Sequence, residues 1–338
     1  TFWIYILLAK MALVQDIKKE VFTYHNLVHA ISGMTGGVTA ITAFYPLNII
    51  RMKLQVDENM KSESVVAIAK KILEEQGIEG LYQGWWSSVV SLGASNFVYF
   101  YTYNAFKTIY RKLIAKKDKV DIDPVTNLLI ASLAGVINVV MTTPLWIAGT
   151  RLSTQRKSKG KQESKDRTER PYEGVWDCLT RIVKEEGVAA LWKGVGPSLV
   201  LVSNPSIQFV TYERLRAPMA KIAEKRGTAI TAVEFFVMGA IAKAVATVLT
   251  YPLQIAQSRL RADKGTKEDP TKRNYAGTAD VLAKIAKEKG IKGWFKGMEA
   301  KLWQTVLTAA FQFLTYEQVQ KLVFSLLLGK EVKITTGK

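Results

Sequence analysis

Six long apolar runs alternate with polar stretches along the chain of 338 residues. The runs lie near residues 27–50, 86–106, 125–150, 195–212, 231–257 and 302–327. Each run is long enough to cross the hydrocarbon core of a bilayer as a helix, which takes about 17–25 residues. The runs lack the alternation of barrel strands. The pattern therefore predicts an all-α membrane protein with six transmembrane helices.

Three marks recur in each third of the chain. The first is a proline in an apolar run, followed seven residues later by a basic residue and then a leucine: Pro46 with Lys53, Pro144 with Arg151, and Pro252 with Arg259. The second is a pair of glycines seven residues apart: Gly77/Gly84, Gly187/Gly194 and Gly290/Gly297. The third is a tyrosine near the end of the next apolar run: Tyr103, Tyr212 and Tyr316. This self-similarity predicts three pseudo-symmetric repeats, and the prolines predict three equivalent helix kinks.

Each repeat also has a polar stretch between its two apolar runs. Residues 62–76, 173–186 and 276–289 combine helical periodicity with mixed charge, which predicts a short amphipathic helix on one membrane face. We expect repeats over residues 25–118, 119–226 and 227–327. An N-terminal extension (residues 1–24) and a C-terminal tail (residues 328–338) would flank them.

The net charge of +18 lies mostly between the apolar runs, with a basic cluster at residues 156–170. Such a cluster is typical of segments that bind anionic lipid headgroups or attract anionic solutes, and a plain solvated loop is the alternative. A nucleic-acid-binding function is disfavoured, because the basic residues interrupt bilayer-length runs and no zinc-ligand or RNA-binding signature is present.

The sequence offers little for covalent chemistry. One cysteine, Cys178, excludes an intrachain disulfide and a cysteine metal cluster. His25 and His29 are spaced for one helix face, but they lack a third ligand, so we predict interfacial histidines and no metal site. There is no phosphate-binding GxxxxGK[ST] loop and no nucleophile–base pair. We therefore expect neither an enzyme nor an ATP-driven pump.

These repeats resemble the mitochondrial carrier family over residues 27–325. That family repeats P-x-[DE]-x-x-[KR]-x-[KR], then [DE]-G-x-x-x-x-aromatic-[KR]-G, then [FY]-[DE]-x-x-[RK]. More specific stretches resemble the family's peroxisomal carriers of adenine nucleotides and coenzymes: residues 95–102, 142–146, 204–205, 250–254, 299–302 and 304–310.

The resemblance implies a secondary transporter of the peroxisomal membrane. It would exchange coenzyme A, FAD, NAD or AMP/ADP by alternating access, as an antiporter without cofactors. We expect a monomer that contacts membrane lipids, with anionic lipids as candidates. Two alternatives stay open: a mitochondrial inner-membrane carrier of NAD, FAD or folate, and a carrier-like scaffold that transports nothing.

The family closes each side of its cavity with a ring of charged pairs, and this chain departs from that pattern. On the proline side, the ring positions hold Asn48, Arg51, Trp146, Gly149, Gln254 and Gln257. Only Arg51 is charged, so the full ring cannot form, and the glutamines would brace this gate by hydrogen bonds. On the tyrosine side, the positions hold Asn104, Lys107, Glu213, Arg216, Glu317 and Gln320, which is enough for a partial ring.

The resemblance places substrate contacts on the even-numbered spans, at Ser91, at Val200 with Leu201, and at Gln304 with Thr305. None is basic, so charges for phosphate binding must lie elsewhere. Lys243 interrupts an apolar run and Lys301 begins another. Because charged residues within a membrane usually face a transport pathway, these two lysines are the candidates for phosphate binding. Each residue also has a purely structural alternative. The polar residues would form hydrogen bonds between helices, Lys301 would extend its ammonium to the membrane interface, and Lys243 would form an ion pair with an acid such as Glu299.

Overall fold

The computed structural model describes residues 38–56, 64–111, 122–155, 170–264, 275–308 and 311. In this part of the chain the backbone is largely helical and contains no β-strand. The elements are α3 (Tyr45–Val56), α4 (Val65–Leu81), α5 (Trp85–Ile109), α6 (Pro124–Thr154), α7 (Val175–Glu185), η2 (Val188–Trp192), α8 (Val195–Leu201), α9 (Asn204–Lys225), α10 (Ala232–Ala262), α11 (Thr278–Lys289) and η4 (Ile291–Phe295). Residues 38–43 and 298–308 are also helical.

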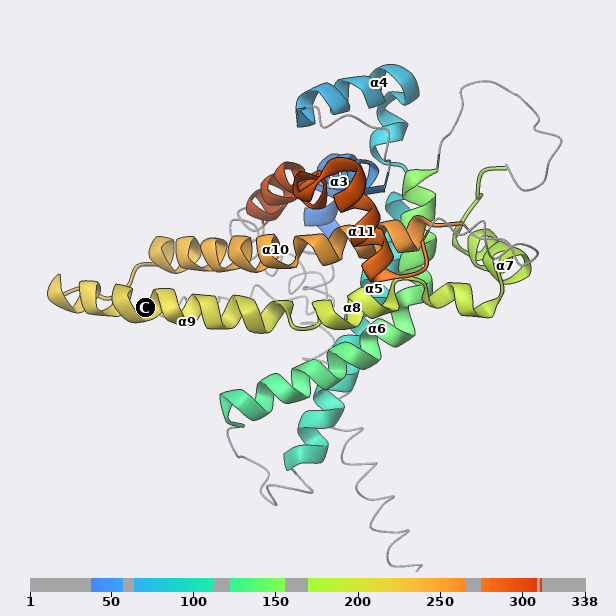
Figure 1. Cartoon of the computed structure of the whole chain (residues 1–338). Helices are drawn as coiled ribbons and strands as arrows, with labels where there is room; N and C mark the ends of the chain where they lie inside the picture. Colours follow the sequence, from blue (N-terminus) through green and yellow to red (C-terminus); the bar gives the residue numbers. More distant parts are fainter. Residues whose placement is uncertain are drawn as a thin grey trace, which may run out of the picture.

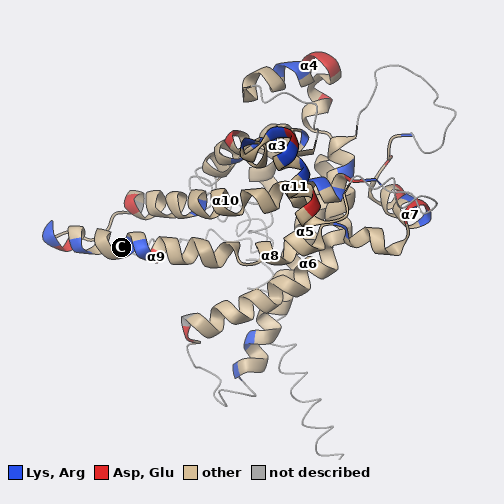
Figure 2. Ribbon diagram, viewed as in Figure 1, with Lys and Arg blue, Asp and Glu red and all other residues tan. Residues whose placement is uncertain are grey.

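Helices α5 and α6 lie side by side, as do α9 and α10, and the two pairs converge at the centre of the molecule (Figure 1). Helices α6 and α10 contain 31 residues each, and both are long and apolar enough to cross a membrane. Most of α6 carries no charged residue, whereas Lys, Arg, Asp and Glu are frequent on the surface helices (Figure 2). The predicted first and sixth spans extend beyond the described residues.

The fourth predicted span, residues 195–212, is divided. Helix α8 ends at Leu201 and α9 begins at Asn204, with a turn at Val202 and Ser203. Pro205 follows the turn, and its ring excludes the backbone hydrogen bond that a continuous helix would need there. The three repeat prolines also differ from one another: a turn at Phe44 precedes Pro46, whereas α6 and α10 continue through Pro144 and Pro252.

The polar stretch of each repeat forms a surface helix, α4, α7 or α11. Each surface helix buries two residues four positions apart. They pack against the odd-numbered span of the same repeat, in the half that follows the proline. The pairs occupy equivalent repeat positions: Ile68 and Ile72, Cys178 and Ile182, Val281 and Ile285. Residues four apart share a helix face, so this pair fixes which face of the amphipathic helix is buried. Cys178 therefore occupies a packing position.

The second glycine of each repeat packs against the odd-numbered span of the next repeat. Gly84 has φ 71°, and a Cβ atom there would lie 2.4 Å from Oγ of Ser153 in α6. A Cβ atom at Gly194 would lie 3.2 Å from the carbonyl oxygen of Gln257 in α10, and one at Gly297 would lie 3.1 Å from Cβ of Leu54 in α3. The three repeats are thereby joined in a closed cycle, which matches the predicted pseudo-symmetry.

Candidate functional site

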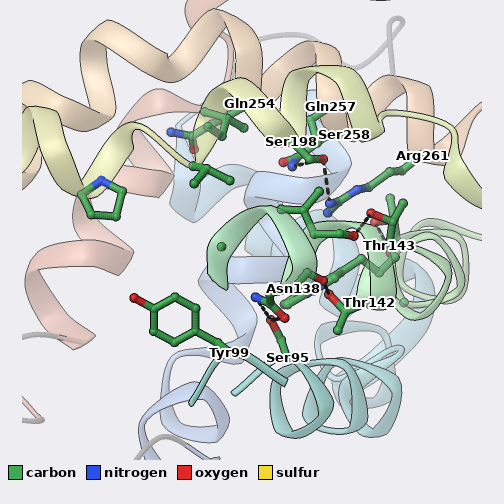
Figure 3. A pocket seen from close by; sticks show the side chains of 18 of the residues that line it. Ser95, Tyr99, Asn138, Thr142, Thr143, Ser198, Gln254, Gln257, Ser258 and Arg261 are labelled. Atoms are coloured by element: carbon green, nitrogen blue, oxygen red, sulfur yellow. Dashed lines mark hydrogen bonds between the residues drawn. The ribbon is translucent and has the colours of Figure 1, made fainter. Parts of the chain in front are cut away.

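A cavity of about 570 Å³ lies where the three repeats meet. Its lining comes from α3, α5, α6, α8, α9, α10 and the helical segments 38–43 and 298–308. Figure 3 labels lining residues of α5, α6, α8 and α10. The lining residues are Ile41, Asn48, Arg51, Met52, Ser88, Ser95, Tyr99, Leu128, Ala131, Ser132, Gly135, Asn138, Val139, Thr142, Thr143, Trp146, Gly149, Thr150, Ser198, Leu201, Val202, Pro205, Ser206, Gln254, Gln257, Ser258, Arg261, Lys301 and Gln304. The mixture of apolar, hydroxyl and amide groups is typical of a small-molecule site.

Three of these lining residues, Arg51, Arg261 and Lys301, are cations, and none is Asp or Glu. Arg51 donates from Nη2 to Oδ1 of Asn48 at 2.7 Å. Arg261 donates from Nη2 to Oγ of Ser198 at 3.2 Å, and its guanidinium lies 5.8 Å from the ring centroid of Trp146. A cavity with this charge favours an anionic ligand.

Buried polar atoms in the cavity are left without hydrogen-bond partners among the described residues. They include Nε of Arg51, Nε of Arg261 and Oε1 of Gln304. An unpartnered buried donor is costly, so such atoms mark places where a ligand or water completes the site.

The predicted substrate contacts divide into two groups. Leu201, Gln304 and Lys301 line the cavity. Ser91, Val200 and Thr305 are not among its lining residues: Ser91 donates to the carbonyl oxygen of Leu145 at 3.0 Å, Val200 is 55% exposed, and Thr305 donates to the carbonyl oxygen of Lys301 at 2.8 Å. Ser91 therefore makes the helix-to-helix hydrogen bond that was its structural alternative.

Lys243 lies partly buried on α10, outside the set of cavity-lining residues. Lys301, by contrast, lines the cavity together with Arg51. Glu299 is exposed, and no ion pair between Lys243 and Glu299 occurs in the structure. Of the two predicted phosphate-binding lysines, the structure therefore places Lys301 in the cavity lining and Lys243 outside it.

The four predicted proline-side gate residues, Asn48, Arg51, Gln254 and Gln257, all line the cavity. The glutamines do not bond to one another: Gln257 donates to Oγ of Ser198 at 2.7 Å, and Gln254 donates to Oγ1 of Thr250 at 3.1 Å. Gln257 therefore connects α10 with α8. The glutamine brace of the gate stays a prediction.

The proline-side ends of α3 and α10 are joined through Gln55, a residue that the family motifs do not single out. Gln55 donates from Nε2 to the hydroxyl of Tyr251 at 3.2 Å, and its Oε1 accepts from Ser258 at 2.9 Å. Arg259 donates to the Gln55 carbonyl oxygen at 3.1 Å. One feature of the sequence marks this position. The residue nine positions after each repeat proline is polar in every repeat: Gln55, Ser153 and Arg261.

The ends of α6 and α10 are joined by a buried charge network. Arg151 forms an ion pair with Glu186 and donates from Nη2 to the carbonyl oxygen of Asp263 at 2.7 Å. Lys193 lies 2.7 Å from Oε2 of Glu186 and donates to the same Asp263 carbonyl at 3.0 Å. Because these contacts join repeats two and three, sequence spacing within one repeat does not reveal them.

On the tyrosine side, the described gate residues contact neighbours in their own helices. The ammonium of Lys107 lies 5.1 Å from the ring centroid of Tyr103, and Arg216 lies 3.6 Å from Glu213. Asn104 is exposed, and Glu317 lies outside the described residues. The partial ring of this gate stays a prediction.

The described part of the chain contains no group of three or more metal-ligating side chains. His25 and His29, as well as the basic residues 156–169, lie outside the described residues.

The family model described as "Mitochondrial carrier protein" matches residues 22–113, 121–222 and 229–326. The chain is 42% identical over 311 residues to "Peroxisomal membrane protein PMP34" of Mus musculus, with 91% of this chain and 97% of the relative covered. It is 34% identical over 317 residues to "Peroxisomal nicotinamide adenine dinucleotide carrier" of Arabidopsis thaliana, with 87% of this chain and 95% of the relative covered.

A further relative, "Peroxisomal membrane protein PMP47B" of Candida boidinii, is 28% identical, with 93% of this chain and 90% of the relative covered. Members of this family are solute transporters without cofactors, and they are not enzymes. The chain thus belongs to the mitochondrial carrier family, as a multi-pass solute carrier of the peroxisomal membrane.

Proposed function

We propose that the protein exchanges adenine-containing nucleotides and coenzymes, such as coenzyme A, FAD, NAD and AMP/ADP, by alternating access. The observation that carries this proposal is the cavity charge: among the described residues, Arg51, Arg261 and Lys301 line the cavity, and no Asp or Glu does. All the proposed substrates carry phosphate, and the low-dielectric wall of a cavity strengthens the attraction between phosphate and cation. The relative named as a nicotinamide adenine dinucleotide carrier supports the same class.

The described helix ends support alternating access. On the proline side, α3, α6 and α10 are tied to one another through Gln55, Arg151 and the hydrogen bond between Tyr45 and Ser153 at 3.2 Å. On the tyrosine side of the described structure, Lys107 lies over the ring of Tyr103 and Glu213 pairs with Arg216, each within its own helix. This arrangement suits a cavity closed at its proline-side end, and transport would require the opposite arrangement in turn.

We further propose a monomer that contacts anionic lipids through its surface helices. On α4, Lys70 and Lys71 are exposed close to Val66, which is 72% exposed. An apolar side chain beside basic residues suits the boundary between headgroups and acyl chains. Comparing thermal unfolding in vesicles with and without phosphatidylinositol would test the lipid contact.

The function is tested by counter-exchange in liposomes. Purified protein would be reconstituted with internal ADP, and uptake of labelled ADP, NAD, FAD and coenzyme A would be followed. We expect uptake of at least one of these that depends on internal nucleotide, with no uptake of adenosine. A protein that is folded and inserted but takes up none of them would instead indicate the non-transporting scaffold.

A further inference from the structure

The proline-side end of the cavity carries two arginines where the family pattern would supply acids as well as bases. The acidic ring positions hold Asn48, Trp146 and Gln254, so Arg51 has no acidic partner in the ring. Arg261, nine residues after the third proline, adds a second cation at the same end. Both arginines line one cavity, and two like charges in a low-dielectric site repel each other.

We infer that Arg51 and Arg261 form a clamp for a diphosphate group, and that the bound diphosphate supplies the negative charge that holds the proline-side end closed. The inference rests on the proposed function and deepens it. ADP, NAD, FAD and coenzyme A share a diphosphate, whereas AMP has a single phosphate. The clamp therefore assigns diphosphate-bearing adenine compounds as the preferred substrate class.

Neutral groups orient both guanidinium groups and leave donors available. Arg51 is held by the amide oxygen of Asn48, and Arg261 by the hydroxyl of Ser198. The Nε atoms of Arg51 and Arg261 are buried without a hydrogen-bond partner among the described residues. Arginine offers a planar fork of donors that matches phosphate oxygens, and two such forks suit two linked phosphates.

The clamp would connect the repeats whose proline-side ends come together to close the cavity. Arg51 belongs to α3 in the first repeat and Arg261 to α10 in the third, and Ser198 of α8 belongs to the second (Figure 3 shows Ser198 and Arg261). Close by, Gln55 already joins α3 to Tyr251 and Ser258 of α10. An anion bound between the two arginines converts their repulsion into two attractions and so favours this closed end.

The test uses inorganic pyrophosphate as the probe, with orthophosphate as the single-phosphate comparison. Thermal unfolding of the full-length protein in detergent would be titrated with both anions for wild type, Arg51→Gln and Arg261→Gln. We expect pyrophosphate to raise the Tm of wild type at lower concentration than orthophosphate. Each glutamine variant would need about tenfold more pyrophosphate, because a charge-assisted hydrogen bond is lost.

Arg214→Gln is the matched control, since Arg214 is exposed on α9 and outside the cavity lining. It should respond to pyrophosphate like wild type. If a glutamine variant does not fold, Arg261→Lys replaces it, and a weakened response is expected because an ammonium lacks the planar fork. Equal responses of wild type to the two anions, or arginine variants with an unchanged pyrophosphate response, would overturn the clamp.

Exchange in liposomes separates this inference from the proposed function. If wild type exchanges no nucleotide, the proposed function fails even where pyrophosphate still binds. If wild type exchanges ADP and the arginine variants bind pyrophosphate normally, the clamp alone fails. If both hold, Arg261→Gln should slow uptake of ADP about tenfold more than uptake of AMP.

Discussion

Arg151 and Glu186 form an ion pair in which both side chains are nearly fully buried, with exposed fractions of 1% and 4%. The pair joins α6 to the end of α7, and Arg151 continues to the carbonyl oxygen of Asp263 after α10. A buried pair gives little net stability by itself, but removal of one partner leaves the other charge uncompensated. The pair therefore fixes how the second and third repeats meet. Breaking it should lower the stability of the folded protein.

Arg151→Met should therefore destabilise the protein by about 3–5 kcal/mol, because Glu186 loses its guanidinium partner inside the molecule. Thermal unfolding in detergent measures this. The control is Arg170→Met, which breaks an ion pair to Glu173 with side chains 58% and 71% exposed. The control should change stability by less than about 1 kcal/mol. Equal losses in the two variants would contradict the assignment of a buried network.

The Glu186 carboxylate should make the stability of the protein depend on pH. Burial works to raise the pKa of Glu186, but hydrogen bonds and charges from Arg151 and Lys193 outweigh it and hold the pKa below the ordinary 4.5. A carboxyl with a lowered folded-state pKa contributes stability that is complete above 4.5 and is lost as pH falls through the folded-state value. Glu186→Gln should remove this component, so its unfolding temperature should fall less steeply than that of wild type below pH 4.5.

Cys178 is expected to take no part in transport. It is fully buried beneath α6, at the repeat position held by Ile68 and Val281. Burial, the largest cause, raises the pKa of its thiol to about 12. At pH 7 the reactive thiolate is therefore scarce, and maleimide labelling of the folded protein should be far slower than of the denatured protein.

Cys178→Ser should preserve nucleotide exchange and lower stability by about 1–3 kcal/mol, because a hydroxyl enters an apolar cluster. Exchange in liposomes and thermal unfolding would be measured on the same preparation. Loss of exchange from correctly inserted protein would place Cys178 in the transport machinery instead.

The second glycine of each repeat offers a test of the cyclic contact. Gly84→Ala places a methyl group where Oγ of Ser153 lies 2.4 Å away, on a backbone with φ 71°. The strained conformation alone costs about 1–3 kcal/mol, before any displacement of α6. Gly93→Ala is the matched control, since a Cβ atom at Gly93 in α5 meets no atom within 4 Å. The control should be neutral or slightly stabilising, and equal losses would argue against the contact.

Local features of this fold follow from the sequence, because they depend on residues near one another in the chain. The glycine pairs and the amphipathic surface helices recur at fixed spacing. Contacts between repeats do not follow. Gln55 resembles any polar residue at a helix end, and its role arises only where α3 meets Tyr251 and Ser258 of α10. Arg261 likewise resembles a basic residue at a membrane interface, until α10 places it in the cavity.

The last prediction concerns Lys243 on α10. Its repeat position holds Gly37 and Gly135 in the other two units, so packing within the pseudo-symmetric fold does not require a lysine. Lys243 is partly buried, and it forms no ion pair with the exposed Glu299. An intramembrane ammonium without an acidic partner among the described residues needs an anion, and a phosphate-bearing substrate supplies one.

Lys243→Ala should therefore slow counter-exchange of labelled nucleotide in liposomes, and Lys301→Ala should slow it as well, because Lys301 lines the cavity. Lys243→Arg should restore exchange only in part, because guanidinium and ammonium differ in shape and hydration. Thermal unfolding measured beside exchange separates binding from folding. Normal exchange by the alanine variant would refute a phosphate-binding role. A large loss of stability would instead indicate that Lys243 has a structural role in the fold.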